Sequence, residues 1–115
     1  MSGTGAIALY VTCPSVAVAD AIAQRLVETR LAASVNVIPG AHSLYWWKGR
    51  IERADEVVLI AKTVAVRVEA ATALIVAAHP YDTPAVVALD IVAGNQRYLD
   101  WLKQEATGLG SYLDS

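Results

Sequence analysis

The segment His42-Ser43-Leu44-Tyr45-Trp46-Trp47-Lys48-Gly49-Arg50 predicts a β-hairpin, and this hairpin decides the expected fold. Lys48-Gly49 fits a two-residue turn, because glycine adopts a positive φ without strain. Each arm of the hairpin has about thirteen residues and would extend about 45 Å. A compact domain of this length has a radius of gyration of only about 13 Å. We therefore expect the hairpin to project beyond its own domain.

Trp46 and Trp47 place one indole on each face of this hairpin, since adjacent residues of a strand point to opposite sides. An isolated two-stranded ribbon is only marginally stable. Neighbouring subunits would cover both faces, so we predict self-association with Trp46 and Trp47 at the oligomer interface. The alternative is an ordinary hairpin folded back over its own sheet. The composition favours association, because a 115-residue domain cannot bury the apolar surface of 56% hydrophobic residues alone.

The segments on either side of the hairpin predict further strands and helices. The expected elements are, in order, a buried strand over 6–12, a helix capped by Ser15, a strand from about 33 interrupted at Pro39-Gly40, its hairpin partner over 50–63, a second helix with Thr63 as candidate cap, a strand over 85–92 and a short helix capped by Asn95. This order is the split βαβ arrangement of the ferredoxin-like fold, an α+β antiparallel sheet with helices on one face. We expect one domain over residues 1–115, with a flexible N-terminus (1–5) and a loose or docked tail (107–115).

Charge and composition exclude several classes of partner. The net charge is −2 and no basic run occurs, which argues against nucleic acid. No apolar stretch is long enough to span a bilayer, and the first residues lack the features of a signal peptide. Cys13 is the only cysteine, so an intrachain disulfide is excluded, as suits a reducing compartment. We expect a cytoplasmic protein.

The turn His79-Pro80-Tyr81-Asp82-Thr83-Pro84 is the first candidate for chemistry. Pro80 suits the second position of a type I turn, which would bring the His79 imidazole close to the Asp82 carboxylate. Such a pair can hold a cation or a polar ligand. The alternative, which the local sequence favours, is that His79 complements the negative end of the preceding helix. With the thiol of Cys13, the favoured metal ligands are His79, Asp82 and Cys13, and His42 and the Asp55-Glu56 pair are further candidates.

A second candidate is a ligand cleft between subunits, because aromatic rings with a few charged groups are typical of such pockets. Its expected residues are Tyr45, Trp47, Lys62, His79, Tyr81 and Asp82. In a hairpin without bulges, His42 would face Asp55 across the strands. The favoured alternative makes His42 a half-exposed loop residue, because a bulge at Pro39-Gly40 would shift the register. The sequence contains no nucleophile elbow, HExxH motif or phosphate-binding glycine loop, so we predict that the protein is not an enzyme.

Between Ile7 and Glu105 the chain resembles the CutA divalent-cation-tolerance family. The matching segments are Leu31-Ala32-Ala33, Val35-Asn36-Val37-Ile38-Pro39-Gly40, Ser43-Leu44-Tyr45, Trp47, Gly49, Lys62-Thr63, His79-Pro80-Tyr81, Pro84, Gly94-Asn95 and Tyr98-Leu99-Asp100-Trp101. The resemblance implies a ferredoxin-like subunit similar to PII signalling proteins, assembled as a homotrimer through its hairpin. It also implies a cytoplasmic role in tolerance of copper and other divalent cations.

The chain departs from the family at positions that bear on metal binding. Ser34 stands where a cysteine is frequent, and Asp82 where a glutamate is common. Val11 and Ala78 occupy the positions of a cysteine and a histidine that bind copper in some bacterial members, so only His79 of that ligand set is retained. We expect no required cofactor and, at most, weak binding of a divalent cation such as copper. The alternative function is a PII-like regulatory module that binds a small anionic ligand or a partner protein.

Overall fold

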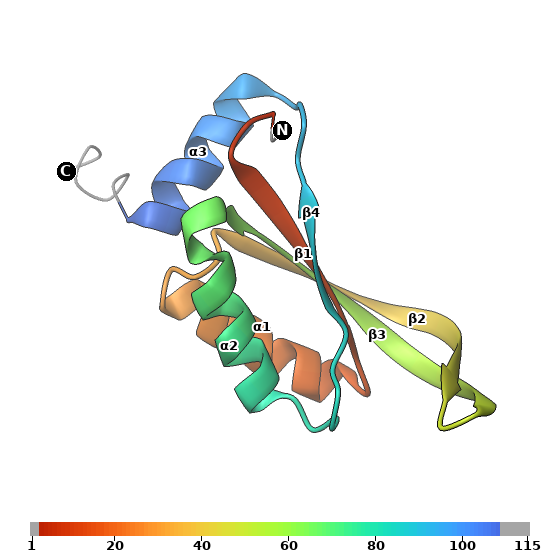
Figure 1. The fold of residues 1–115 in the computed structure, drawn as a ribbon. Coiled ribbons are helices and arrows are strands. Elements are labelled where there is room, and N and C mark those ends of the chain that lie inside the picture. The colour runs from red at the N-terminus through yellow and green to blue at the C-terminus, as the bar shows by residue number, and fades with distance from the viewer. Residues whose placement is uncertain (1–2, 109–115) are drawn as a thin grey trace.

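The strands pair as the predicted α+β plan requires. In the computed structural model, which describes residues 3–108, the elements are β1 (Ala6–Cys13), α1 (Val16–Glu28), β2 (Ser34–Trp47), β3 (Arg50–Val64), a 3-10 turn (Ala65–Arg67), α2 (Val68–Ala78), β4 (Val86–Asp90) and α3 (Gln96–Thr107) (Figure 1). The sheet has the order β2-β3-β1-β4, and every neighbouring pair is antiparallel. This is the strand order of the split βαβ fold, so the predicted fold class is confirmed.

Two helices cover one face of the sheet, where the main core lies. Leu9 and Leu59 point to this face and pack with Ile22 and Leu26 of α1 and Ile75 of α2, all of them buried. Each of these side chains contributes about 1.5–3 kcal/mol by leaving water. The predicted cap of α1 is confirmed, because the Ser15 hydroxyl accepts a hydrogen bond from the Val18 amide.

The third helix packs at the end of the sheet, on the side away from α1 and α2. Leu99 and Leu102 of α3 contact Ala6 and Val64, which alternation places on the second face. Lys103 donates to the Thr4 carbonyl at 3.1 Å, so the described chain is held from Thr4 onward. α3 continues to Thr107. Gly108 is its C-cap, with a φ of 81°. Residues 109–115 of the predicted tail and residues 1–2 of the predicted flexible start lie outside the described residues.

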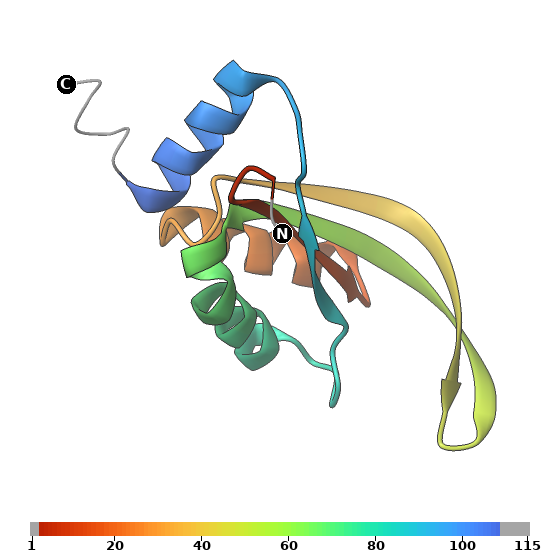
Figure 2. The same ribbon diagram turned by 45° about the horizontal axis from the view of Figure 1, so that its top comes forward.

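The hairpin of β2 and β3 extends beyond the rest of the domain (Figure 2). Its arms have 14 and 15 residues, and the longest dimension of the chain is 52 Å. Lys48 and Gly49 have φ angles of 51° and 77°, which confirms the predicted two-residue turn. The radius of gyration, 15.0 Å, exceeds the value of about 13 Å for a compact domain of this length. The expected projection of the hairpin is therefore confirmed.

Thr63 does not cap the second helix, contrary to the prediction. It belongs to β3, and α2 begins only after the 3-10 turn, with Arg67 as its N-cap residue and no side-chain cap. The Thr63 hydroxyl is buried and has no hydrogen-bond partner within the described residues. Apolar residues stand on both sides of Thr63, at positions 57–61 and 64–66, so the apolar pattern did not mark the boundary between strand and helix. Within residues 3–108, no helix has the length and apolarity needed to cross a bilayer.

The second face of the sheet carries apolar side chains that no helix covers. Tyr10, Ile38, Val87 and Leu89, one or two from each of β1, β2 and β4, are between 37% and 50% exposed. The strand register places all four on the same side, and we call this surface the open face. An antiparallel sheet with one solvated face ordinarily shows polar residues there. The open face therefore has the composition of a surface that contacts another protein.

Candidate functional site

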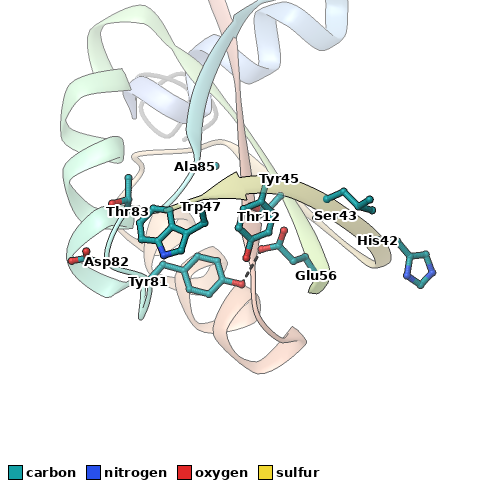
Figure 3. Close-up of a pocket in the computed structure, with 11 residues that line it drawn as sticks. Thr12, His42, Ser43, Tyr45, Trp47, Glu56, Tyr81, Asp82, Thr83 and Ala85 are labelled. Carbon is teal, nitrogen blue, oxygen red and sulfur yellow. Dashed lines mark hydrogen bonds between the residues drawn. The ribbon is translucent and has the colours of Figure 1, made fainter. Parts of the chain in front are cut away.

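A cavity of about 660 Å³ lies where the hairpin leaves the body of the domain. Its walls come from β2, from the C-terminal end of β1, from the middle of β3 and from the segment between α2 and β4 (Figure 3). The lining residues are Thr12, His42, Ser43, Leu44, Tyr45, Trp47, Glu56, Tyr81, Asp82, Thr83 and Ala85. This volume is within the range of pockets that bind small molecules.

A hydrogen-bonded pair, Glu56 and Tyr81, forms the polar part of the cavity. The Tyr81 hydroxyl donates to Oε2 of Glu56 at 2.9 Å, and Glu56 is only 7% exposed. Burial, together with the hydrogen bond to Glu56 and the charge of this carboxylate, raises the pKa of Tyr81 to about 12. The phenol therefore keeps its proton at neutral pH and acts as a hydrogen-bond donor.

The bulge at Pro39-Gly40 determines which hairpin side chains reach the cavity. Ile38 pairs with Val58, whereas Ala41 pairs with Glu56, so β2 contains one extra residue between these pairs. Gly40 adopts a φ of 95° there, as a bulge glycine does. Because one extra residue exchanges the two faces of a strand, Tyr45 and Trp47 share the face of Glu56. Without the bulge, Trp46 would occupy that face and Trp47 the opposite one.

His79 is a buried structural residue and does not line the cavity. Its Nε2 atom donates to the Thr12 carbonyl at 2.8 Å, while its Nδ1 atom accepts from the Tyr81 amide at 3.1 Å. The ring is 7% exposed and lies 4.6 Å from the Tyr81 ring, centroid to centroid. Each nitrogen already has a partner, so neither offers a lone pair to a metal. His79 thus connects β1 to the segment after α2, a role that neither predicted alternative included.

The other predicted ligands are dispersed. Cys13 is buried in the main core, and burial, with a smaller contribution from the Glu56 charge, raises the pKa of its thiol. A protonated thiol is a poor metal ligand. Asp82 lies at one end of the cavity, away from the Glu56–Tyr81 pair (Figure 3). Lys62 is six residues, about 20 Å, from Glu56 along β3, and its ammonium lies 5.1 Å from the centroid of the Tyr98 ring.

The predicted metal ligands are therefore not brought together within one chain. Among residues 3–108, no three side chains of the ligand types His, Cys, Asp and Glu are placed to hold a metal ion. His42 and Asp55 do form a pair, with Nδ1 2.9 Å from Oδ1. The bulge lies beyond this pair, so the register predicted for a bulge-free hairpin holds at His42, and the favoured alternative was wrong. Both side chains are exposed to solvent.

Of the predicted cleft, Tyr45, Trp47, Tyr81 and Asp82 line the cavity, whereas Lys62 and His79 do not. Glu56 is the residue that the prediction of the cleft missed. Its signal in the sequence was a carboxylate directly before the apolar run Val57-Val58-Leu59-Ile60-Ala61, a position where burial is expected. Its partner Tyr81 is 25 positions away, a separation over which sequence patterns carry no pairing information.

The chain matches the family described as "CutA1 divalent ion tolerance protein" over residues 7–105. It is 46% identical over 97 residues to "Protein CutA" of Homo sapiens, which covers 84% of this chain and 54% of the human protein. It is 45% identical over 96 residues to "Divalent-cation tolerance protein CutA" of Thermus thermophilus, which covers 84% of this chain and 93% of that protein. The match thus spans about half of the human relative and nearly all of the bacterial one.

The fold agrees with solved structures of the same group. The crystal structure of CutA from Xylella fastidiosa superposes with a TM-score of 0.86 at 40% identity, covering 89% of this chain and 98% of that chain. Names of relatives place them in different compartments, chloroplastic in rice and periplasmic in Archaeoglobus fulgidus. The family match over most of the chain, the identities of 40–46% and the shared fold agree. This chain belongs to the CutA1 divalent ion tolerance family.

Proposed function

We propose that this chain acts in divalent-cation tolerance as a non-enzymatic, homotrimeric binding protein, with its ligand site in the cavity beside the hairpin. The observation that carries the proposal is the cavity itself. Rings from the hairpin, Tyr45 and Trp47, face a buried carboxylate whose hydrogen-bond partner, Tyr81, belongs to a distant segment. Convergent aromatic and polar groups of this kind bind ligands with little reorganisation. The pKa of Tyr81 is raised to about 12, so this phenol keeps its proton and is not activated as a nucleophile, which supports a binding role rather than catalysis.

Two uncovered surfaces support the homotrimer. The open face presents Tyr10, Ile38, Val87 and Leu89 to solvent in a single chain. On the hairpin, Trp46 is 73% exposed and shares its face with Leu44 and Ile51, which are also exposed. Association of identical chains removes both apolar surfaces from water at once. The family resemblance favours three subunits.

The role in cation tolerance does not require a metal held inside one chain. Because His79, Asp82 and Cys13 are dispersed, we propose that no cofactor is required and that copper or another divalent cation binds weakly. Copper(II) binds accessible imidazoles readily, and His42 is the exposed imidazole. The PII-like alternative ranks second, because the cavity lining contains two carboxylates and neither lysine nor arginine. We propose the cytoplasm as the location, consistent with the unpaired Cys13.

Light scattering combined with thermal shift tests this proposal. The full chain should scatter with three times its mass of 12.2 kDa at micromolar concentration. Excess chelator should leave the melting temperature and the oligomer unchanged, since no structural metal is expected. Small organic ligands that enter the cavity should raise the melting temperature, and Trp47→Leu should abolish that rise. A folded monomer would refute the proposed assembly. Loss of the oligomer in chelator would show that the assembly depends on a structural metal.

A further inference from the structure

We propose that the cavity selects small organic cations, compounds with an ammonium group, and rejects anions. This inference rests on the proposed function, because it assumes that the cavity binds a ligand. It goes further by assigning the chemical class of the ligand from the charge and shape of the walls.

The aromatic walls provide the first argument. Tyr45, Trp47 and Tyr81 line the same cavity, and the faces of such rings attract cations. Three rings around one space form the arrangement by which aromatic cages recognise alkylated ammonium groups. The Lys48 ammonium lies 5.7 Å from the centroid of the Trp47 ring, so this ring already has a cation as a neighbour.

The charge of the cavity provides the second argument. Glu56 is almost fully buried, and the Tyr81 hydroxyl is the single hydrogen-bond donor that residues 3–108 offer to its carboxylate. A buried carboxylate without a cationic partner is costly, so a bound cation would recover part of that cost. Asp82 adds a second carboxylate at one end of the cavity, and neither lysine nor arginine lines it. A ligand anion would meet two carboxylates of the lining, where the one basic lining residue, His42, already pairs with Asp55 and the Lys48 ammonium lies at the Trp47 ring.

The third argument separates an organic cation from a bare metal ion. Divalent ions require several oxygen, nitrogen or sulfur ligands around one point. Here the cavity offers Glu56, Asp82 at one end and His42, which pairs with Asp55, and within residues 3–108 no three such ligands converge on one point. The ring faces donate no lone pair. Tyr81 keeps its proton because its pKa is raised to about 12, so it supplies no phenolate. A volume of about 660 Å³ is also much larger than a dehydrated ion needs.

Three probes of similar size and different charge test the inference: tetramethylammonium, tert-butanol and pivalate. Each is titrated into the uniformly ¹⁵N-labelled full chain at constant ionic strength, while the three indole N–H signals are followed by NMR. Trp47→Phe identifies the Trp47 signal. Tetramethylammonium should move this signal saturably, with a dissociation constant in about the millimolar range, and should leave the Trp101 signal unchanged. Neither tert-butanol nor pivalate should move it at the same concentrations.

Matched variants link the binding to the carboxylate. Glu56→Gln keeps an acceptor for Tyr81 but removes the charge, and should weaken tetramethylammonium at least about tenfold. Asp55→Asn removes the same charge from the neighbouring residue on the opposite strand face, and should change the affinity by less than about twofold. If Glu56→Gln does not fold, Tyr45→Leu serves in its place, because it removes a ring of the cavity and keeps the Trp47 signal, with an expected loss of about tenfold.

The outcomes are distinct. Stronger binding of pivalate than of tetramethylammonium at Trp47 would overturn the cationic class but keep the cavity as a ligand site. Equal weakening by Glu56→Gln and Asp55→Asn would remove the specific role of the buried carboxylate, and with it the inference. If no probe moves the Trp47 signal, the inference and the assignment of the cavity both fail, while the trimer is judged separately by light scattering.

Discussion

Replacing His79 should strongly destabilise the protein. The expected cause is the loss of buried hydrogen bonds and not the loss of a metal ligand. His79→Ala removes the hydrogen bonds from Nε2 to the Thr12 carbonyl and from the Tyr81 amide to Nδ1. A typical hydrogen bond contributes about 1 kcal/mol, and a buried group left without a partner costs about 1–3 kcal/mol. Because the ring is buried and two backbone groups lose their partner, we expect the free energy of unfolding to fall by about 2–4 kcal/mol.

A series of variants separates the two bonds. His79→Asn keeps an acceptor near the position of Nδ1, and His79→Gln keeps a donor near that of Nε2, so each should recover part of the loss. The matched control is His42→Ala, whose side chain is 83% exposed and whose pair with the exposed Asp55 should contribute about 0–1 kcal/mol.

Urea unfolding followed by circular dichroism measures the series at one fixed protein concentration, because an oligomer gains stability with concentration. We expect the order of destabilisation to be His79→Ala, then Asn and Gln, then the control. If His79→Ala costs no more than His42→Ala, the buried bonds do not stabilise the fold and the reasoning is wrong.

Three further predictions follow from the site and the hairpin. The pKa of Tyr81 is raised from 10 to about 12, so the contribution of this residue to stability is fully present below pH 10 and is lost as pH rises toward 12. Urea unfolding should therefore show that the free energy of unfolding falls less between pH 10 and pH 12 in Tyr81→Phe than in the unchanged protein. Trp46→Ala should weaken the assembly by about 2 kcal/mol or more, seen by light scattering on dilution, and an unchanged oligomer would exclude this indole from the interface. Copper(II) binding, measured by calorimetry, should fall more in His42→Gln than in His79→Gln, because only the first imidazole is exposed; the reverse order would show that copper displaces the buried bonds.

The candidate site was only partly predictable. Tyr45, Trp47, Tyr81 and Asp82 were expected in a cleft and line the cavity, since aromatic residues near a rigid turn are an unusual local composition. Lys62 was grouped with them as a charged residue, but its ammonium lies over the Tyr98 ring near the C-terminal end of β3, away from the cavity. Glu56 was considered only as a metal ligand beside Asp55 and was not expected in the cleft, because its hydrogen-bond partner Tyr81 is distant in sequence.

The sequence by itself determined the order of the elements, the Lys48-Gly49 turn, and the caps Ser15 and Asn95. These features depend on interactions within a few residues, such as positive φ at a turn or a side chain bonded to the next amides, so a short segment contains all the information.

The tertiary structure alone decided where the side chains of the site meet. The single extra residue at Gly40 turned Trp47 rather than Trp46 toward Glu56, and the packing of β1 against the segment after α2 gave both nitrogens of His79 a partner. Such contacts depend on strand register and on the path of loops between distant segments. A change of one residue in either exchanges the partners while leaving every local pattern intact.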